Sequence, residues 1–445
     1  MKRISLGAVY EAGLVAILFL IVLHAPVSVW LGTVLPDYTT LLKAWKEIAL
    51  LMLAIVAVVL ISRAKLWRTL IHSPPIFLAL AYIDVHFLMA LAFGGEREVV
   101  VAGLMIDLRF VVMFILMYVL VQLRPAAIKR IFASVAAGAA LVIGFGLLQI
   151  TVLPDDILSS IGYSKTTSIA PYITIDTNTD YVRINSTLRG PNPLGALAVV
   201  YITLAVAYLV KRYATASVRR KVALIGGSLA AGAVLFATYS RSAYLALIAA
   251  LAVVVAASVA IKRRVLLGAS IALVGVAGVV ALTAQTDWFS NVILHENPKS
   301  TVVSKSNDEH LRSLQAGWHR LVTQPFGHGI GSTGSASLYD ANPRNDVIIE
   351  NYYFFVAHEV GWLGAALFIG LFGYVMVQLW RQKSDWRALG VFASGIGLAI
   401  IGLLLPVWAD DTVALTWWAL AGAVMAMRSP TPKPRHLTPL PSHKN

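Results

Sequence analysis

The feature that most constrains this chain is a repeated pattern of apolar runs, many of them about 20 residues long. A helix rises 1.5 Å per residue, so a run of about 20 residues crosses the roughly 30 Å hydrocarbon core of a bilayer. Of the 445 residues, 58% are hydrophobic and only 13% are charged, whereas soluble proteins carry about a quarter charged residues. The sequence therefore predicts an all-α polytopic membrane protein.

Twelve transmembrane helices are expected from these runs. The first run is too long for a signal peptide and lacks a clear cleavage site, so it counts as a span. The integral membrane domain is predicted to cover residues 1–428, with polar loops at 154–191 and 287–345, and a disordered cytoplasmic tail at 429–445. The larger loop separates helices nine and ten. The spans lie near 4–31, 47–61 (with an earlier start at Leu41 as the alternative), 75–93, 99–123, 131–153, 193–210, 222–237, 243–261, 265–284, 348–379, 386–405 and 412–427.

The distribution of basic residues predicts the orientation. With twelve spans, both termini share one side, and that side carries 23 of the 36 Lys and Arg residues with a single acid, Asp385. The opposite side carries 12, mixed with most of the acids. Cytoplasmic loops are enriched in Lys and Arg. We therefore expect a multi-pass protein of the bacterial cytoplasmic membrane, with cytoplasmic termini and extracytoplasmic polar loops.

Several functional classes are excluded by composition. The net charge of +14 lies in short loops on one side, as membrane insertion selects, so it does not indicate nucleic-acid binding. Cysteine is absent and no histidine pair has metal-ligand spacing, so no metal or cofactor is predicted. No internal repeat is evident, which disfavours transporters built from inverted repeats.

Two arginines precede the predicted start of the sixth span. Arg189 precedes Gly190-Pro191-Asn192-Pro193, where Asn192 is a good N-cap and Pro193 a good first helical residue. A helix N-terminus attracts anions, and arginine offers a bidentate fork to phosphate. Arg183 and Asn192 are therefore expected to bind substrate beside Arg189. The alternative is that Arg189 reaches the lipid headgroups.

A third arginine lies in the tight turn between the seventh and eighth spans. Arg241 is flanked by Ser240 and Ser242, and positive charge on the outer side gains nothing from insertion rules. Both serines are predicted to cap the following helix and donate to an anion. Pairing of Arg241 with a lipid phosphate is the alternative.

The large loop carries a glycine-rich segment, Gly327–Gly334, that includes His328. It formally matches a dinucleotide fingerprint, but no strand–turn–helix pattern surrounds it, so that interpretation is rejected. A backbone nest for an anion and a loop without a ligand both remain open. The preceding segment, Asn307 to Gln324, is predicted to be a surface helix lying over the membrane.

Carboxylates lie at the starts of the tenth and the twelfth spans. Glu350 and Asn351 open the tenth span, where a carboxylate can act as a general base. Asp410-Asp411 lies at the turn before the last span and could bind a metal or orient a sugar, with Asp411 the expected substrate contact. Interhelical hydrogen bonding is the alternative for Glu350 and the favoured interpretation for Glu359.

Charged residues also lie within the spans. Asp84, His86, Asp107 and Arg109 fall in the third and fourth spans, and we expect them to form one structural ion-pair cluster rather than a proton path. Glu11 in the first span is a further candidate member.

The order of these motifs resembles that of the bacterial O-antigen ligases and O-antigen polymerases. The resemblance depends on Arg189-Gly190-Pro191-Asn192-Pro193-Leu194-Gly195, Tyr239-Ser240-Arg241-Ser242-Ala243, Gly327-His328-Gly329-Ile330-Gly331, and Glu350-Asn351 followed by Gly361-Trp362-Leu363-Gly364.

The resemblance implies a membrane glycosyltransferase that takes a glycan from a polyprenyl diphosphate carrier and transfers it to a glycan or glycolipid acceptor. Arg189 and Arg241 would hold the diphosphate, and Glu350 would be the third catalytic residue. His328, Asn351 and Asp411 complete the implied substrate-binding set. Implied partners are the lipid-linked donor, the acceptor, the bilayer and other envelope polysaccharide assembly proteins. In the ligases a histidine opens the last motif, and here that position holds Glu350, which leaves ligase and polymerase equally open.

Two other classes remain as alternatives. A transporter or flippase for lipid-linked glycans would line a path with the same arginines, and a structural scaffold of an envelope assembly complex would tolerate their loss.

Overall fold

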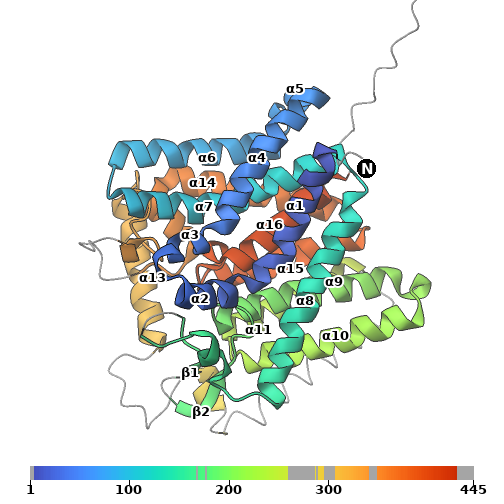
Figure 1. Cartoon of the computed structure of the whole chain (residues 1–445), viewed down its shortest axis with the longest axis vertical. Helices are drawn as coiled ribbons and strands as arrows, with labels where there is room; N and C mark the ends of the chain where they lie inside the picture. Colours follow the sequence, from blue (N-terminus) through green and yellow to red (C-terminus); the bar gives the residue numbers. More distant parts are fainter. Residues whose placement is uncertain are drawn as a thin grey trace, which may run out of the picture.

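The computed structural model describes residues 5–166, 169–175, 178–258, 286, 289–294, 306–339 and 348–427. Within these ranges the chain is a bundle of helices with one small hairpin (Figure 1). The helices are α1 (Leu6–Leu20), α2 (His24–Val34), α3 (Thr39–Lys43), α4 (Trp45–Ala64), α5 (Trp67–Ile71), α6 (Pro74–Phe93), α7 (Arg97–Leu123), α8 (Ala127–Thr151), α9 (Pro191–Arg212), α10 (Val218–Ala237), α11 (Arg241–Ser258), α13 (Ser306–Thr323), α14 (Tyr352–Arg381), α15 (Trp386–Gly402) and α16 (Asp411–Ala426).

The polytopic membrane class predicted from sequence is confirmed. Eight helical segments in the described ranges are long and apolar enough to cross a membrane, and α11, α15 and α16 are shorter apolar helices. Each of these segments overlaps a predicted span. The ninth predicted span, near 265–284, most of the 287–305 segment and the 428–445 tail lie outside the described residues.

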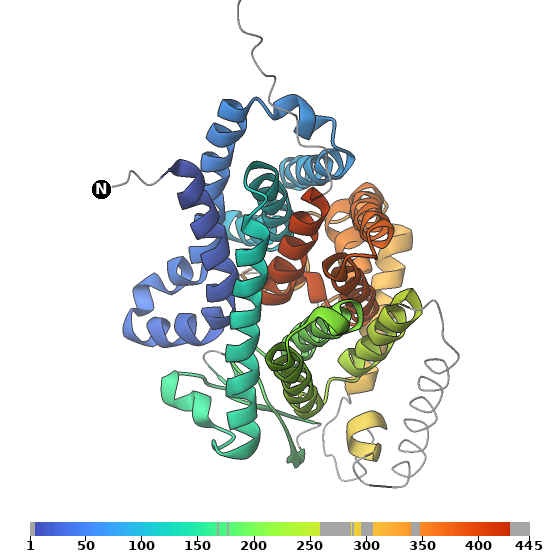
Figure 2. The ribbon, with the colours of Figure 1, turned by 90° about the vertical axis from the view of Figure 1, so that its right-hand side faces the viewer.

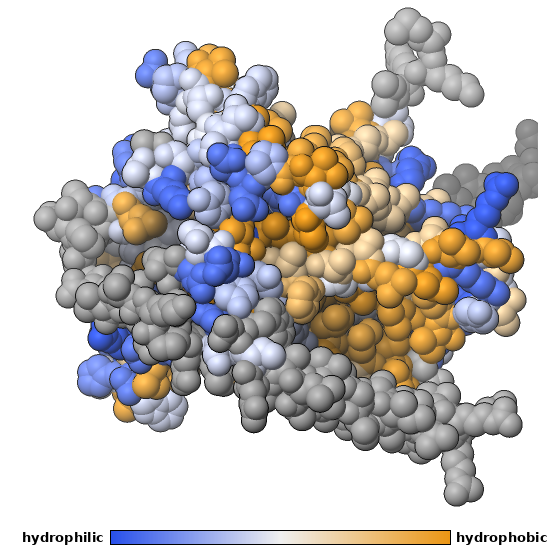
Figure 3. Space-filling model, turned by 90° about the horizontal axis from the view of Figure 1, so that it is seen from below, coloured by the Kyte–Doolittle hydropathy of each residue, from blue (hydrophilic) through white to orange (hydrophobic). Residues whose placement is uncertain are grey.

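The lipid-facing surface follows from the exposed apolar side chains. Leu51 and Ile55 on α4, Leu88 and Leu91 on α6 and Leu229 on α10 are exposed although they belong to the most hydrophobic segments. Figure 3 shows a broad hydrophobic area over part of the bundle, with hydrophilic residues gathered towards the opposite ends of the molecule. That pattern is expected when the solvent of the middle of the bundle is lipid.

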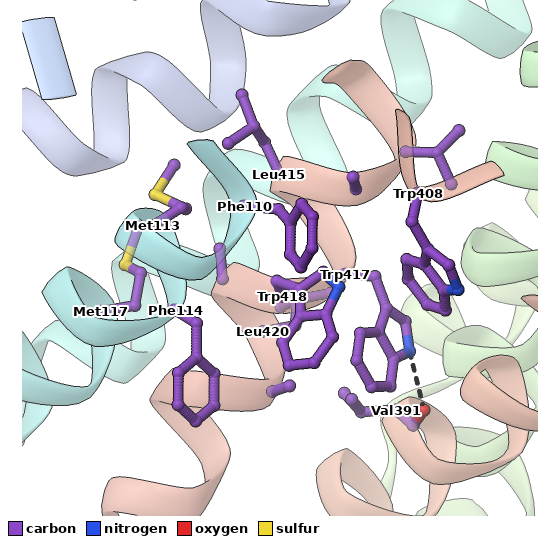
Figure 4. Packing of buried hydrophobic residues seen from close by; sticks show 14 of the residues in the cluster. Phe110, Met113, Phe114, Met117, Val391, Trp408, Leu415, Trp417, Trp418 and Leu420 are labelled. Atoms are coloured by element: carbon purple, nitrogen blue, oxygen red, sulfur yellow. Dashed lines mark hydrogen bonds between the residues drawn. The ribbon is translucent and has the colours of Figure 1, made fainter. Parts of the chain in front are cut away.

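The centre of the bundle is α16, which packs on α7, α9, α14 and α15 (Figure 2). All 16 of its residues are buried, which is typical of a helix enclosed by others. Trp418 packs on Phe110 and Phe114 of α7, and Trp408 and Trp417 pack on Trp418 and on each other. The Trp417 indole N–H donates to the Val391 carbonyl at 3.0 Å (Figure 4). Small residues allow close approach here, since a Cβ on Gly422 would lie 2.4 Å from the Phe114 carbonyl oxygen.

A two-stranded antiparallel hairpin departs from the all-α expectation. Strand β1 (Ile173–Ile175) pairs with β2 (Asn178–Arg183) inside the predicted 154–191 loop. Alternating β-branched residues favour strands over helix at this point. The hairpin leads into the segment that begins α9, so it positions Arg183 and Arg189.

Helix α14 is broken at Gly361, whose φ of 69° lies in the left-handed region. The glycine-rich segment fills the break, because the His328 and Gly329 amides donate to the carbonyls of His358 and Glu359, and the Trp362 amide donates to Pro325. A Cβ on Gly361 would lie 2.6 Å from the Pro325 carbonyl oxygen. This close backbone packing, together with the positive φ, explains the glycine at position 361.

The expected cluster of charges within the third and fourth spans is wrong in its membership. His86 does lie 4.0 Å from Asp107, but Asp84 is exposed and Arg109 pairs with Glu47 at 3.2 Å. Residues two apart on a helix point to opposite sides, so neither Asp84 and His86 nor Asp107 and Arg109 can share a face. Glu11 pairs instead with Arg124 at 2.6 Å and Arg130 at 3.0 Å, at the far end of the bundle.

Candidate functional site

A small cavity, lined by apolar residues and a few charged ones, opens where α9 begins and the α15–α16 connection passes beside it. Its volume is about 270 Å³. That is near the lower limit of about 300 Å³ for small-molecule sites, so the cavity suits a compact charged group better than a whole glycan. The lining residues come from the hairpin, α9 and the 401–410 segment, and they are Ile173, Arg183, Arg189, Gly190, Pro191, Asn192, Pro193, Ala196, Ile401, Leu405, Pro406, Val407 and Asp410.

Helix α9 begins two residues earlier than the sequence suggested. Its N-cap is Gly190, and Pro191 rather than Pro193 is its first residue, so Asn192 is not the cap. Two of the first three residues are therefore prolines without an N–H group. The helix end offers few amide donors, and anion binding here depends on the arginine side chains.

Arg189 faces a carboxylate across the cavity. Its Nε lies 2.9 Å from Oδ2 of Asp410, while its side chain remains 40% exposed. Asp410 is also the N-cap of α16, because its Oδ1 accepts from the Val413 amide at 3.0 Å. The cap fixes the carboxylate, and the carboxylate holds Arg189 at the cavity wall.

Arg183 joins the cavity to the α10–α11 turn. Its Nη2 donates to Asn192 Oδ1 at 2.7 Å, and its Nε donates to the Thr238 carbonyl at 2.8 Å. Burial lowers the pKa of Arg183 to about 10, and the nearby charge of Arg241 acts in the same direction. The repulsion between these two guanidinium groups decreases when an anion binds between them.

The turn itself is tightly built. Tyr239 adopts φ 47°, an uncommon conformation for a residue with a Cβ, and Ser240 donates its amide to Thr238 Oγ1 at 3.2 Å. Ser240 and Ser242 are buried, 2% and 7% exposed, and their hydroxyls face each other at 3.3 Å. They stabilise the turn that presents Arg241, and neither hydroxyl lines the cavity.

Helix α13 brings Arg241 and Glu350 together. The surface helix expected over Asn307–Gln324 is confirmed as a helix, and Figure 1 shows it crossing the edge of the bundle beside α14. Arg241 Nη2 donates to Asn307 Oδ1 at 2.8 Å, and one turn later His310 Nδ1 hydrogen-bonds to Glu350 Oε2. Residues three apart share a helix face. The same face of α13 therefore contacts Arg241 and Glu350 at points about one helical turn apart.

Asn351 has a structural position. Its Oδ1 accepts from the amides of Tyr353 and Phe354 at 3.0 and 3.1 Å, which caps α14, and its Nδ2 donates to the Leu403 carbonyl at 2.8 Å. The side chain therefore ties the Glu350 segment to the end of α15, near the cavity wall.

His328 lies apart from the arginines. Its ring stacks on that of His358 with centroids 5.4 Å apart, beside the break in α14. Because its amide and that of Gly329 already donate to α14 carbonyls, these amides do not form an anion nest. Among the described residues, those that line the cavity include neither His328 nor Arg241 nor Glu350.

Asp411 points away from the cavity. Its Oδ2 lies 3.2 Å from Lys46 Nζ, 3.3 Å from His24 Nε2 and 3.9 Å from Arg109 Nη1. Together with Glu47 these side chains form a closed inner cluster, each at most 13% exposed. Arg109 also donates to the Ala409 carbonyl, which fixes the turn before α16.

Sequence reasoning missed two residues of this region. Asp410 was recognised only as one half of an acidic pair, and the cap position that turns it towards Arg189 is set by where α16 begins. His310 carried no motif, and only its place one turn after Asn307 on a predicted helix hinted at its contact. In the part of the chain that the structure describes, no three His, Asp or Glu side chains gather so that they could hold a metal ion.

A bundle of lipid-exposed helices that gathers arginines at a small cavity defines a polytopic membrane protein with a basic site at one end. Residues 226–369 match the family model described as O-antigen ligase. The resemblance predicted from its motifs is thereby confirmed for this part of the chain. The match includes Arg241 and Glu350. None of the curated proteins compared with the chain matches it.

Proposed function

We propose that this protein moves a glycan from a polyprenyl diphosphate carrier to a glycan or glycolipid acceptor at the outer face of the bacterial cytoplasmic membrane. The observation that carries the proposal is the cavity at the start of α9, where Arg183 and Arg189 oppose the single carboxylate of Asp410. Arg241 adds a further positive charge close to Arg183.

The excess of positive charge suits a diphosphate. Transfer of the glycan breaks the bond between its anomeric carbon and the phosphate oxygen, and negative charge accumulates on that oxygen. Fixed guanidinium groups stabilise such charge without reorganising during the reaction, which is often the largest catalytic contribution. Arg189 takes this role at the cavity wall, which Arg183 and Asn192 also shape, and Arg241 contributes from beside Arg183.

The acceptor is expected to approach from the α13 side. Glu350 and His310 are 31% and 35% exposed there, one helical turn from the Arg241 contact. A base at that place is positioned to take the proton of an acceptor hydroxyl while the arginines hold the leaving group.

Transfer by purified protein tests the proposal. In detergent, wild type should convert a polyprenyl diphosphate-linked glycan and an acceptor to product, whereas Arg189→Ala and Arg241→Ala should each lower the rate at least about 100-fold. Arg97→Ala is the matched control, because Arg97 is an exposed arginine at the start of α7. Full activity of both variants would overturn the site. A flippase would instead show no product in detergent but would move the donor across vesicles.

Topology reporters test the orientation. Fusions at Ser337, in the large loop, and Ala214, between α9 and α10, should report opposite sides, with Ser337 extracytoplasmic. A cytoplasmic Ser337 would contradict transfer at the outer face.

A further inference from the structure

We infer that His310 is the catalytic base of the transfer and that Glu350 is its positioning residue. This rests on the proposed function. The carboxylate expected to act as base is itself engaged by an imidazole from α13, and the two side chains form one unit.

Two contacts with α13 hold Glu350 in place. His310 Nδ1 hydrogen-bonds to Glu350 Oε2, and the Glu350 amide donates to the buried Ser313 Oγ at 2.8 Å. Asn307, His310 and Ser313 are spaced by three residues, so one face of α13 holds Arg241 and then both the side chain and the backbone of Glu350. The imidazole is thus fixed relative to an arginine assigned to the leaving group.

The hydrogen bond decides which nitrogen can accept a proton. A carboxylate only accepts, so Nδ1 carries the hydrogen and the lone pair lies on Nε2. Histidine is the side chain that most often serves as a general base, and the carboxylate fixes the tautomer and the orientation of the ring. With the ring 35% exposed, an acceptor hydroxyl can approach it.

The proposed reaction is a displacement at the anomeric carbon. Nε2 of His310 takes the acceptor hydroxyl proton while the acceptor oxygen forms a bond to the anomeric carbon. The bond between that carbon and the phosphate oxygen breaks, and its electron pair leaves with the lipid diphosphate beside Arg241. The imidazolium then releases its proton to water, so glycosylated acceptor, lipid diphosphate and one proton are the products.

The test uses the full-length protein in detergent with a lipid-linked glycan donor. His310→Ala should lower kcat at least about 100-fold while the donor KM stays within about twofold, and added imidazole should restore part of the rate. His319→Ala is the matched control, because His319 is an exposed histidine on the same helix. His310→Gln keeps a donor to Glu350 but no base, so it should be equally slow with an unchanged melting temperature.

Glu350 should respond differently from His310. Glu350→Gln should lower kcat about 10- to 100-fold without a change in donor KM, and Glu350→Asp should recover part of the loss, whereas imidazole should not rescue either. If wild type transfers glycan and His310→Gln transfers it equally well, His310 is not the base and the inference fails while the proposed function stands. If wild type shows no transfer, the proposed function itself fails.

Discussion

Asp410 and Asp411 are neighbours in the chain, yet their side chains belong to two different groups of charges. Asp411 closes an inner cluster in which Lys46 and Arg109 meet two carboxylates and every member is nearly buried. Asp410 faces a cavity in which Arg183 and Arg189 outnumber it and Arg189 stays 40% exposed. Both groups lie at the same turn before α16.

The difference separates structural charges from ligand-binding ones. A buried group of ions that balances its own charge has no capacity left for a ligand, and its value lies in fixing the packing of its helices. A solvent-accessible group with excess positive charge is destabilised by repulsion between its like charges until an anion binds. Arg109 links the two, because it pairs with Asp411 and donates to the Ala409 carbonyl beside Asp410.

The same substitution at Asp410 and Asp411 should give the largest difference, which is a difference in the stability of the protein. Asp411→Asn leaves Lys46 and Arg109 without a compensating charge and should destabilise the protein by about 3–5 kcal/mol. Asp410→Asn should change stability little, because asparagine caps a helix as well as aspartate does. Thermal unfolding in detergent measures both, with the exposed Asp155→Asn as control. Equal melting temperatures for the two variants would remove the distinction.

Loss of the cavity arginine should affect the ligand and not the fold. Arg189→Ala removes a charge-assisted contact and should weaken binding of a polyprenyl diphosphate about 10- to 100-fold, with the melting temperature unchanged. Binding of the lipid to purified protein measures the effect. An unfolded variant would mean that Arg189 belongs with the structural charges.

The Asp410 carboxylate competes with the ligand for Arg189. Asp410→Asn should therefore tighten binding of the lipid diphosphate about three- to tenfold, the opposite direction from Arg189→Ala. The double variant should bind as weakly as Arg189→Ala alone, since the competition needs both partners. Weaker binding by Asp410→Asn would indicate that the carboxylate orients the arginine and does not compete.

Salt should act on only one of the two groups. The Debye length falls from about 10 Å at 0.1 M to about 3 Å at 1 M, so binding at the exposed arginine should weaken several-fold over this range. The buried cluster is shielded from ions, so the melting temperature should change little. A parallel loss of stability and binding would show that the inner cluster is open to solvent.

Much of the fold was readable from the sequence because its signals are local. Apolar length identifies membrane helices, and the capped, Pro-terminated pattern around Asn307–Gln324 located α13 to within a residue at each end. The β1–β2 hairpin and the break of α14 at Gly361 were not foreseen. Both depend on what another segment supplies, as when the glycine-rich loop donates to the carbonyls exposed at the break.

The candidate site was readable only in part. The arginines were recognised because charge at the edge of a span is costly and therefore unusual. Their partners could not be derived, since the residue that meets Arg189 lies more than 200 positions away, and the one that meets Glu350 lies 40 positions back. The motif order shows a carboxylate where the resembling ligases carry a histidine, whereas the structure supplies an imidazole from α13.

The sequence by itself determined that this chain lies in a membrane as a bundle of helices and that it resembles the O-antigen ligases, because hydrophobic length and motif order are properties of the chain. Only the tertiary structure decided which charges face each other. Asp410 and Asp411 are chemically identical, and the direction in which the start of α16 turns each carboxylate gives one to the cavity and the other to the inner cluster.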